Sequence, residues 1–581
     1  MTTRSATCLL LLTLMAGPAG AQTPRAERLA SPDALFYVDI IQPKAVLKNV
    51  ADPGLQRAVA DLPGVAEALK KPDVAGLPAV ATYVAQLLGT DVPDAAARLL
   101  GGGVSLVVEG EKGPERAFVV VTPADAGFLG KAHETFLDLA RKDAAGKGMP
   151  DPIKENEYQG TKVYSTSPAE AHAIAGGVLV VSNSADTLRM VLDRLAKPPT
   201  TSLADSADWK ARRDSLPKDT VAWTYVNLAK LRQIDPATYA PEKPNPALAF
   251  IAGPWYESLL KADSASMALR WGDGKLGAEF TLPKPAAGRS KASETYIPPA
   301  GASAPPALKP PGVIASMTLW RDLSKVWDNR ADIFPPETLA GLAQLDTTAG
   351  TFFAGRDFST GVLGSLTSDW RLVVAQQDVK TLSPVPATKL PSFALVVGLR
   401  PEDEEFADRL MSAFTSFVGL VNIGAQQSKA PPLMPRVETF EGVTIQSSKF
   451  SAPRNVPKGE PVHQRHNFSP SAAIVDHQFI LGSSLTLTRD LVHAVKNPGP
   501  AEPATLAMDI DGGKLAKLVE DNKAGLVADN MLKKGIAKPQ AEAENASLAR
   551  VLRYLNRGHL QAVDGPDASR LRLDFNPEAK P

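Results

Sequence analysis

The most regular hydrophobic pattern in the chain is a strand followed by a helix, between Ile174 and Ala196. Apolar residues run almost without interruption to Val181, as in a strand that is buried on both faces. Ser182-Asn-Ser184 follows, and such side chains cap the first backbone N–H groups of a helix. The next turns place their apolar residues on one helix face, at Leu188, Val191, Leu192 and Leu195. The stretch therefore predicts one buried strand, a serine cap and an amphipathic helix.

The same pattern recurs 300 positions later, from Ile474 to Val495. A second apolar helix face also occurs twice, at an offset of 278 positions. Its first copy is Phe128, Ala132, Phe136 and Leu139, and its second copy is Phe406, Leu410, Phe414 and Phe417. Both halves of the chain end in a strand hairpin. The matching order predicts an internal duplication with two homologous domains, because two copies are too few for a solenoid.

Alternation of polar and apolar residues indicates the fold class. Residues 570–575 alternate strictly, as in an antiparallel strand with one face in solvent. We therefore predict an α+β fold with two homologous domains, each a mainly antiparallel sheet with helices packed on one face. The domains span residues 29–283 and 312–577. The Pro/Ala/Ser-rich residues 284–311 between them predict an extended linker.

Three local signals predict where elements begin or turn. Thr122-Pro123 predicts a helix start, because the missing N–H of proline costs nothing in the first turn. Gly272-Asp-Gly274 has the composition of a tight hairpin turn. His477, next to Asp476, aligns with Gly177 of the first half, and we expect it at a hairpin turn as well.

Composition and charge narrow the function classes. The chain has 581 residues, 44% of them hydrophobic, which is enough for a folded core in each of two domains. Its 63 basic residues balance its 63 acidic ones. A nucleic-acid-binding protein or a polybasic membrane-surface protein would show an excess of Lys and Arg, so we expect neither.

The N-terminus predicts export. Arg4 is followed by a short apolar run from Cys8 to Ala16, and Ala19-Gly-Ala21 has the pattern that signal peptidase cleaves. We predict a signal peptide at residues 1–21, no transmembrane segment after its cleavage, and a periplasmic or extracellular location. The chain has one cysteine, which lies in this segment. The mature chain therefore has no disulfide, thiolate metal site or cysteine nucleophile.

Histidine pairs are the first candidates for metal chemistry. His463 and His466 form an H-x-x-H pair, but no acidic residue lies between Glu460 and Asp476 to complete a site. They stay weak candidates, a polar surface loop is the preferred interpretation, and we predict no metal and no cofactor. His133-Glu-Thr-Phe136 begins like a zinc-protease motif, yet Leu occupies the position of the second histidine.

Other short motifs fail on their spacing, and we predict no catalytic residue. Ser215-Leu-Pro-Lys218 matches S-x-x-K in letters, but its proline opposes the helical turn that would bring lysine to serine. Gly101 to Gly103 lacks the Gly-Lys-Ser/Thr ending of a phosphate loop and predicts a strand entry. Asp509-Ile-Asp-Gly-Gly513 lacks the ligand spacing of a calcium loop, so we expect a strand followed by a turn.

Aromatic residues could stack on sugars or peptides if they were exposed. Trp223 and Tyr225 alternate on one predicted strand, and Trp320 and Trp327 lie near the start of the second half. We expect all four in the core.

The segments from Leu88 to Val108, from Gly177 to Ser184 and from Leu29 to Ile40 carry a resemblance to known proteins. Their Gly-x-Asp helix start, Leu-Gly-Gly strand entry and strand–serine–helix order resemble large exported bacterial proteins that form a family of unknown function. The resemblance covers most of the first half and, more faintly, the second. It implies export and a tandem α+β fold, and it supplies no catalytic residues.

These observations favour an exported, non-enzymatic envelope protein that acts by binding or scaffolding. Its partner would be another envelope protein or a cell-wall glycan. The alternative is an exported hydrolase whose Ser, Asp or Glu site is assembled from residues distant in sequence. A deep pocket with a Ser–His pair or perturbed carboxylates would favour the hydrolase.

Overall fold

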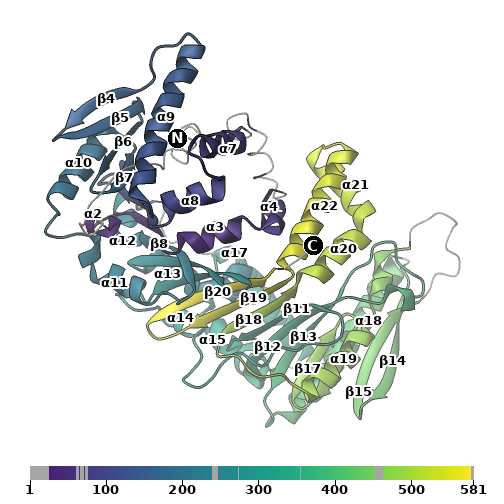
Figure 1. Ribbon diagram of the computed structural model, residues 1–581. Coiled ribbons are helices and arrows are strands. Elements are labelled where there is room, and N and C mark those ends of the chain that lie inside the picture. Colours follow the sequence, from purple (N-terminus) through teal and green to yellow (C-terminus); the bar gives the residue numbers. More distant parts are fainter. Residues whose placement is uncertain are drawn as a thin grey trace. The chain divides into compact units, whose positions relative to one another are not determined.

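In the computed structural model the chain forms two compact units (Figure 1). The structure describes residues 25–60, 76–237, 246–272, 274–353, 355–428, 430–451 and 462–577, and the single positions 65, 68 and 71. The predicted signal peptide, residues 1–21, lies outside the described residues. Unit 1 holds the described residues up to 237 and residues 259–286, and unit 2 holds residues 246–258 and 287–577.

Unit 1 contains one antiparallel sheet of consecutively paired strands. In spatial order the strands are β4 (Lys154–Tyr158), β5 (Thr161–Ser167), β6 (Glu170–Ala175), β7 (Val178–Ser182), β3 (Arg116–Thr122), β2 (Gly103–Glu109), β1 (Phe36–Ile40), β8 (Thr220–Asn227), β9 (Ser264–Gly272) and β10 (Lys275–Pro283). The β9–β10 hairpin pairs Gly272 with Lys275 around the predicted glycine turn.

Unit 2 contains an antiparallel sheet with the same order, in which each strand number is raised by ten. The strands are β14 (Leu433–Phe440), β15 (Val443–Phe450), β16 (Ser471–Val475), β17 (Gln478–Gly482), β13 (Ser392–Leu399), β12 (Leu366–Ala375), β11 (Val313–Trp320), β18 (Leu506–Asp511), β19 (Arg557–Asp564) and β20 (Ala568–Asn576). The strands and helices together bear out the predicted α+β class.

The α-helices of unit 1 are α2 (Ala26–Leu29), α3 (Pro43–Val50), α4 (Pro53–Ala60), α7 (Leu77–Leu87), α8 (Val92–Leu100), α9 (Ala126–Gly146), α10 (Ala185–Ala196), α11 (Ala207–Asp214) and α12 (Leu228–Ile234). Those of unit 2 are α14 (Lys291–Glu294), α15 (Leu323–Asp328), α16 (Arg330–Ile333), α17 (Pro336–Phe352), α18 (Glu404–Gln427), α19 (Leu485–Lys496), α20 (Gly512–Asp521), α21 (Lys523–Lys534) and α22 (Lys538–Leu555). The boundary between the units falls inside α13 (Pro246–Lys261). Among the described residues, no helix combines the length and the apolar character needed to cross a membrane.

Helices cover both faces of each sheet near its central strands, so the prediction of helices on one face was wrong. In unit 1, α10 packs with Val178 and Val180 of β7, whereas α9 packs with Leu179 and Val181. Successive side chains of a strand point to opposite faces, which places the two helices on opposite sides. In unit 2, α19 packs with Ala473 and Val475 of β16, whereas α18 packs with Ala472 and Ile474.

The stretch from Ile174 to Val181 forms a hairpin and not the single strand predicted. Gly176 and Gly177 have φ angles of +59° and +79°, and the strands pair again directly beside them. Asp476 and His477 take +46° and +55° at the same place in unit 2, which confirms the turn predicted there. Two consecutive positive φ angles match the right-handed twist of a hairpin and favour Gly and Asp.

The predicted serine caps are confirmed, and one predicted helix start was wrong. Ser184 Oγ accepts from the Thr187 N–H at 3.1 Å, and Ser484 Oγ from the Leu487 N–H at 3.3 Å. Thr122 is instead the last residue of β3. Helix α9 begins at Ala126, where the Asp125 carboxylate accepts from the Phe128 N–H at 2.9 Å.

Most of the segment predicted as an extended linker, residues 284–311, belongs to unit 2 and packs into it from residue 287 on. Tyr296 is 1% exposed in a cluster with Val326 and Phe334, and Leu308 is 2% exposed against the central sheet. A single aromatic and a single leucine anchor this segment without any periodic pattern, which is why composition alone predicted a linker.

Removing the serine cap tests the paired helix starts. Ser184→Ala should lower the free energy of unfolding by about 1 kcal/mol, because the Thr187 N–H loses its acceptor. Urea denaturation followed by circular dichroism measures the shift of the transition. Ser184→Asp keeps an acceptor and should retain most of the stability, and equal losses in both variants would contradict a capping role.

Candidate functional site

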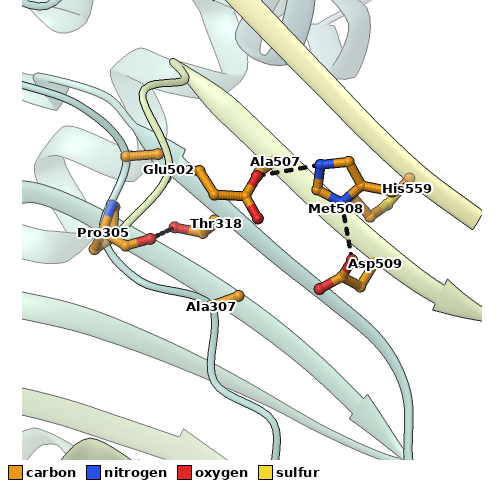
Figure 2. A pocket seen from close by; sticks show the side chains of 9 residues that line it. Pro305, Ala307, Thr318, Glu502, Ala507, Met508, Asp509 and His559 are labelled. Carbon is orange, nitrogen blue, oxygen red and sulfur yellow. Dashed lines mark hydrogen bonds and ion pairs between the residues drawn. The ribbon is translucent and has the colours of Figure 1, made fainter. Parts of the chain in front are cut away.

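A charged cluster centred on His559 lies on the sheet of unit 2. His559 of β19 is the cross-strand partner of Asp509 of β18, and its Nδ1 lies 2.9 Å from Asp509 Oδ1. Its Nε2 lies 3.1 Å from Oε2 of Glu502, which precedes β18 (Figure 2). Carboxylates at both ring nitrogens favour the doubly protonated imidazolium form. The hydrogen bond to Asp509 raises the pKa of His559, although burial opposes it.

Asp509 extends the cluster to a second cation. Its Oδ2 lies 2.7 Å from Nζ of Lys309. The hydrogen bond from His559, with that from Lys309, lowers the pKa of Asp509 to about 2. Asp509 therefore stays ionised at any physiological pH, and the cluster alternates in charge from Glu502 through His559 and Asp509 to Lys309.

Two hollows adjoin this cluster. A cavity of about 10 Å³, lined by Thr318 and His559 among others, has room for about one water molecule (Figure 2). The second hollow is a cleft of about 360 Å³. Its charged and hydroxyl-bearing lining comprises Lys309, Ser316, Asp509, Asp511, Lys514, Arg557 and His559. Ser316 is 1% exposed, and its Oγ has no hydrogen-bond partner among the described residues.

The floor of the cleft is fixed where β18 leads into α20. Asp511 caps this helix by accepting from the Lys514 N–H at 2.9 Å, and it also pairs with Lys514 Nζ at 3.1 Å. Burial raises the pKa of Asp511, but the hydrogen bonds from Lys514 outweigh burial and lower it. Asp511 therefore ends the strand and starts a helix, so the turn predicted at Asp509–Gly513 was wrong.

Unit 1 has an aromatic core at the corresponding positions. Asn227 caps α12 through the Lys230 N–H just as Asp511 caps α20, and this match aligns β8 with β18. The cross-strand row Ser316–Asp509–His559 then corresponds to Tyr37–Tyr225–Ser266. Tyr37 is 1% exposed and Tyr225 3%. The fold thus accepts a packed aromatic row where unit 2 carries charges and a cleft.

The arrangement does not form a serine–histidine pair. Ser316 lies on β11 and His559 on β19, with β18 between them. Both ring nitrogens of His559 face carboxylates, and Ser316 Oγ has no hydrogen-bond partner among the described residues, so the two side chains are not bonded as a nucleophile and its general base would be. Both carboxylates that line the cleft have lowered pKa values, the opposite of a general acid. The cluster holds fixed charges.

The two weak metal candidates, His463 and His466, have different surroundings in the structure. His463 Nδ1 accepts from the backbone N–H and the Nε–H of Arg465, both at 3.1 Å. The ring of His466 is buried, with its centroid 6.5 Å from that of Phe450, and burial lowers its pKa. Glu460 lies outside the described residues. Within the described parts of the chain, no three His, Asp or Glu side chains gather as metal ligands.

His133 belongs to a buried network that its sequence motif did not indicate. Its Nε2 lies 3.2 Å from Nε2 of His172, whose Nδ1 lies 2.6 Å from Glu170 Oε1. Burial, with the neighbouring His172, lowers the pKa of His133 to about 4.

The remaining candidates occupy structural positions. Trp223, Tyr225, Trp320 and Trp327 are all buried, as predicted. Ser215 ends α11 and donates to the Arg212 carbonyl at 3.0 Å. Gly103 begins β2 as predicted for the glycine run.

Comparisons with known proteins supply no family for this chain. No family model matches it, and no curated protein matches it. Crystal form III of TP0453 overlaps with a TM-score of 0.27 at 10% identity, over 47% of this chain and 84% of that chain. Crystal form I of TP0453 gives 0.25 at 12% identity, over 46% and 82%. TM-scores this low carry no argument about fold or function, so the resemblance to an exported family stays a prediction.

The pKa of His559 tests the charged cluster. Asp509→Asn removes the carboxylate at Nδ1 and should lower the pKa of His559, which NMR titration of the ring protons measures. Because the pKa of His559 is higher in the folded than in the unfolded chain, its protonation stabilises the fold fully below about pH 6.5. This stabilisation is lost as the pH rises through the pKa of the folded state. Asp511→Asn, which leaves both contacts of His559 intact, should change its pKa much less. An unchanged His559 pKa in Asp509→Asn would contradict the assignment.

The buried His133 predicts acid sensitivity of unit 1. Its lowered folded pKa means that the unfolded chain binds more protons between about pH 6.5 and pH 4, so stability falls as pH falls through that range. His133→Gln keeps a side-chain N–H donor without titrating and should reduce the drop in thermal midpoint between pH 7 and pH 4.5. His463→Gln, at an exposed histidine, should leave the drop unchanged. Equal drops in both variants would count against this role.

Proposed function

We propose that this protein is an exported, non-enzymatic envelope protein that acts by binding or scaffolding, and that the cleft beside His559 contacts its partner. The observation that carries the proposal is that the two ring nitrogens of His559 contact the carboxylates of Glu502 and Asp509. A ring with both nitrogens bonded to carboxylates holds its proton, which suits a fixed pattern of donors and acceptors for recognition. Export through the signal peptide predicted at residues 1–21 would place it in the periplasm or outside the cell.

The internal comparison supports a binding role for unit 2. Partly exposed charge clusters contribute little net stability, and unit 1 has the same strand order with Tyr37 and Tyr225 packed at the matching positions. We further propose that the two units are homologous domains that arose by duplication. After it, one copy kept a filled core in this region and the other presents a cleft.

The lining of the cleft supports a polar partner. Ser316 Oγ has an unused hydrogen-bonding capacity, and Arg557 and Lys514 place cations beside Asp511 and Asp509. A neighbouring envelope protein or a cell-wall glycan offers the mixed donors and acceptors that such a surface complements. Nucleic acid is a poorer match, because the 63 basic and 63 acidic residues of the chain balance.

Cleft variants test the proposal. The full chain should co-sediment with purified cell-wall glycan or cross-link to one envelope protein. The double variant Lys514→Gln/Arg557→Gln should weaken that association roughly tenfold or more, because each charged hydrogen bond is worth about 1.5–3 kcal/mol. Lys523→Gln, an exposed lysine on α21, is the matched control.

Two outcomes would contradict the proposal. The first is equal association of the double variant and the control. The second is hydrolytic turnover by the full chain that His559→Gln abolishes, since this would favour the hydrolase. Circular dichroism shows whether each variant is folded before either outcome is interpreted.

A further inference from the structure

Unit 1 contains a groove of about 1080 Å³, far larger than the cleft of unit 2. Its walls come from α2, the end of α10, the segment from Ala204 to Arg213, and the turns near Gln159 and Gly176. Small-molecule sites commonly measure about 300–1000 Å³, so the groove has room for a ligand of that class.

The groove has a local excess of positive charge. It is lined by five cations, Arg25, Arg28, Arg194, Lys210 and Arg213, and by one acid, Glu27. Because the whole chain is formally neutral, this excess is a property of the groove.

Arg194 and Arg25 already have acidic neighbours. Arg194 Nη1 lies 2.9 Å from Oε1 of the buried Glu109 and also donates to the Leu29 carbonyl. Arg25 lies 3.9 Å from Glu27. These two arginines therefore help to hold the walls of the groove together.

Three cations remain available to a ligand. Within the described chain, Arg28, Lys210 and Arg213 have no carboxylate within 4.0 Å of their charged nitrogens. Lys210 Nζ lies 3.4 Å from the Asp205 carbonyl, and the Arg213 guanidinium lies 5.7 Å from the centre of the Trp223 ring. Arg28 and Lys210 act on the Asp205 carboxylate, and Arg213 on that of Asp39, only across more than 4.0 Å, so their N–H groups can still pair with carboxylate or phosphate oxygens.

The same groove offers apolar contacts. Leu29, Leu192 and Trp209 are at most 6% exposed and form part of its lining, and Leu195 and Pro198 line it at more exposed positions. The Trp209 Nε1 has no acceptor among the described residues. Of these, Leu195 and Pro198 have accessible apolar surface, which a ligand that only carried charge would leave unused.

We propose that the groove of unit 1 binds an organic anion with a carboxylate or phosphate head and an apolar body. Arg28, Lys210 and Arg213 pair with the head, and the apolar part lies along Leu195, Pro198 and Trp209. The groove and the His559 cleft differ in charge balance, so the two units select different ligands. This proposal does not depend on the function proposed for unit 2.

Calorimetry with defined probes tests the proposal on the full chain. Octanoate and octyl phosphate supply the two heads on one apolar body, and at least one should bind. Inorganic phosphate and octyl glucoside lack the body or the charge, and each should bind at least tenfold more weakly. All probes are used below the concentrations at which they form micelles.

Variants identify the groove as the site. Arg28→Gln/Arg213→Gln should weaken binding of the preferred probe roughly tenfold or more, because it loses charge-assisted hydrogen bonds. Lys131→Gln, an exposed lysine on α9, and the unit 2 variant Lys514→Gln/Arg557→Gln should leave it unchanged. A failure of both octyl anions to bind, or equal affinity in the groove variant, would overturn the proposal. Equal binding of inorganic phosphate would refute the apolar component, and equal binding of octyl glucoside would refute the charged one.

Discussion

Both sheets depend on central strands that are buried on both faces. Alternate residues of β7 in unit 1 and β16 in unit 2 pack under different helices, so the strand register decides which side chains each helix contacts. A slip of one residue would exchange the two faces and place every side chain under the wrong helix. This double burial holds the helices, and with them the loops that carry the groove of unit 1. In unit 2, charged residues occupy the part of the sheet where β18 and β19 pair.

The sequence predicted the elements whose signals are local. The serine caps at Ser184 and Ser484 and the turn at His477 were predicted correctly, because a cap or a turn is determined by a few adjacent residues. Residues 174–181 were predicted as one strand because strands buried on both faces are apolar throughout. The apolar run therefore shows no boundary between the two strands. The same continuous apolar pattern does not indicate on which faces of the sheet helices pack, and the sequence predicted helices on one face only. Tyr296 shows the opposite limit, since its burial depends on residues far along the chain.

The sequence did not predict the candidate site. Asp509 and Asp511 entered only as a calcium-loop motif that failed on its spacing, and His559 is 50 residues from Asp509 while Lys309 is further still. Cross-strand pairing brings these side chains together, and no short motif encodes it. His463 and His466 are close in sequence, yet one ring is exposed and the other is buried. Proximity along the chain therefore does not place these two rings in the same surroundings.

The difference between the two units is the strongest argument for function. Identical strand order means that the fold itself accepts either an aromatic row or a charged row at the same register. Ion pairs as exposed as His559–Asp509, at 30% and 35%, are screened by water and add little to stability, whereas packed aromatic rings add more. Stability alone would therefore favour the row that contains Tyr37 and Tyr225. This difference supports the proposal that the charges of unit 2 serve to bind a partner, and the cleft beside them is the part of unit 2 where that partner should be sought.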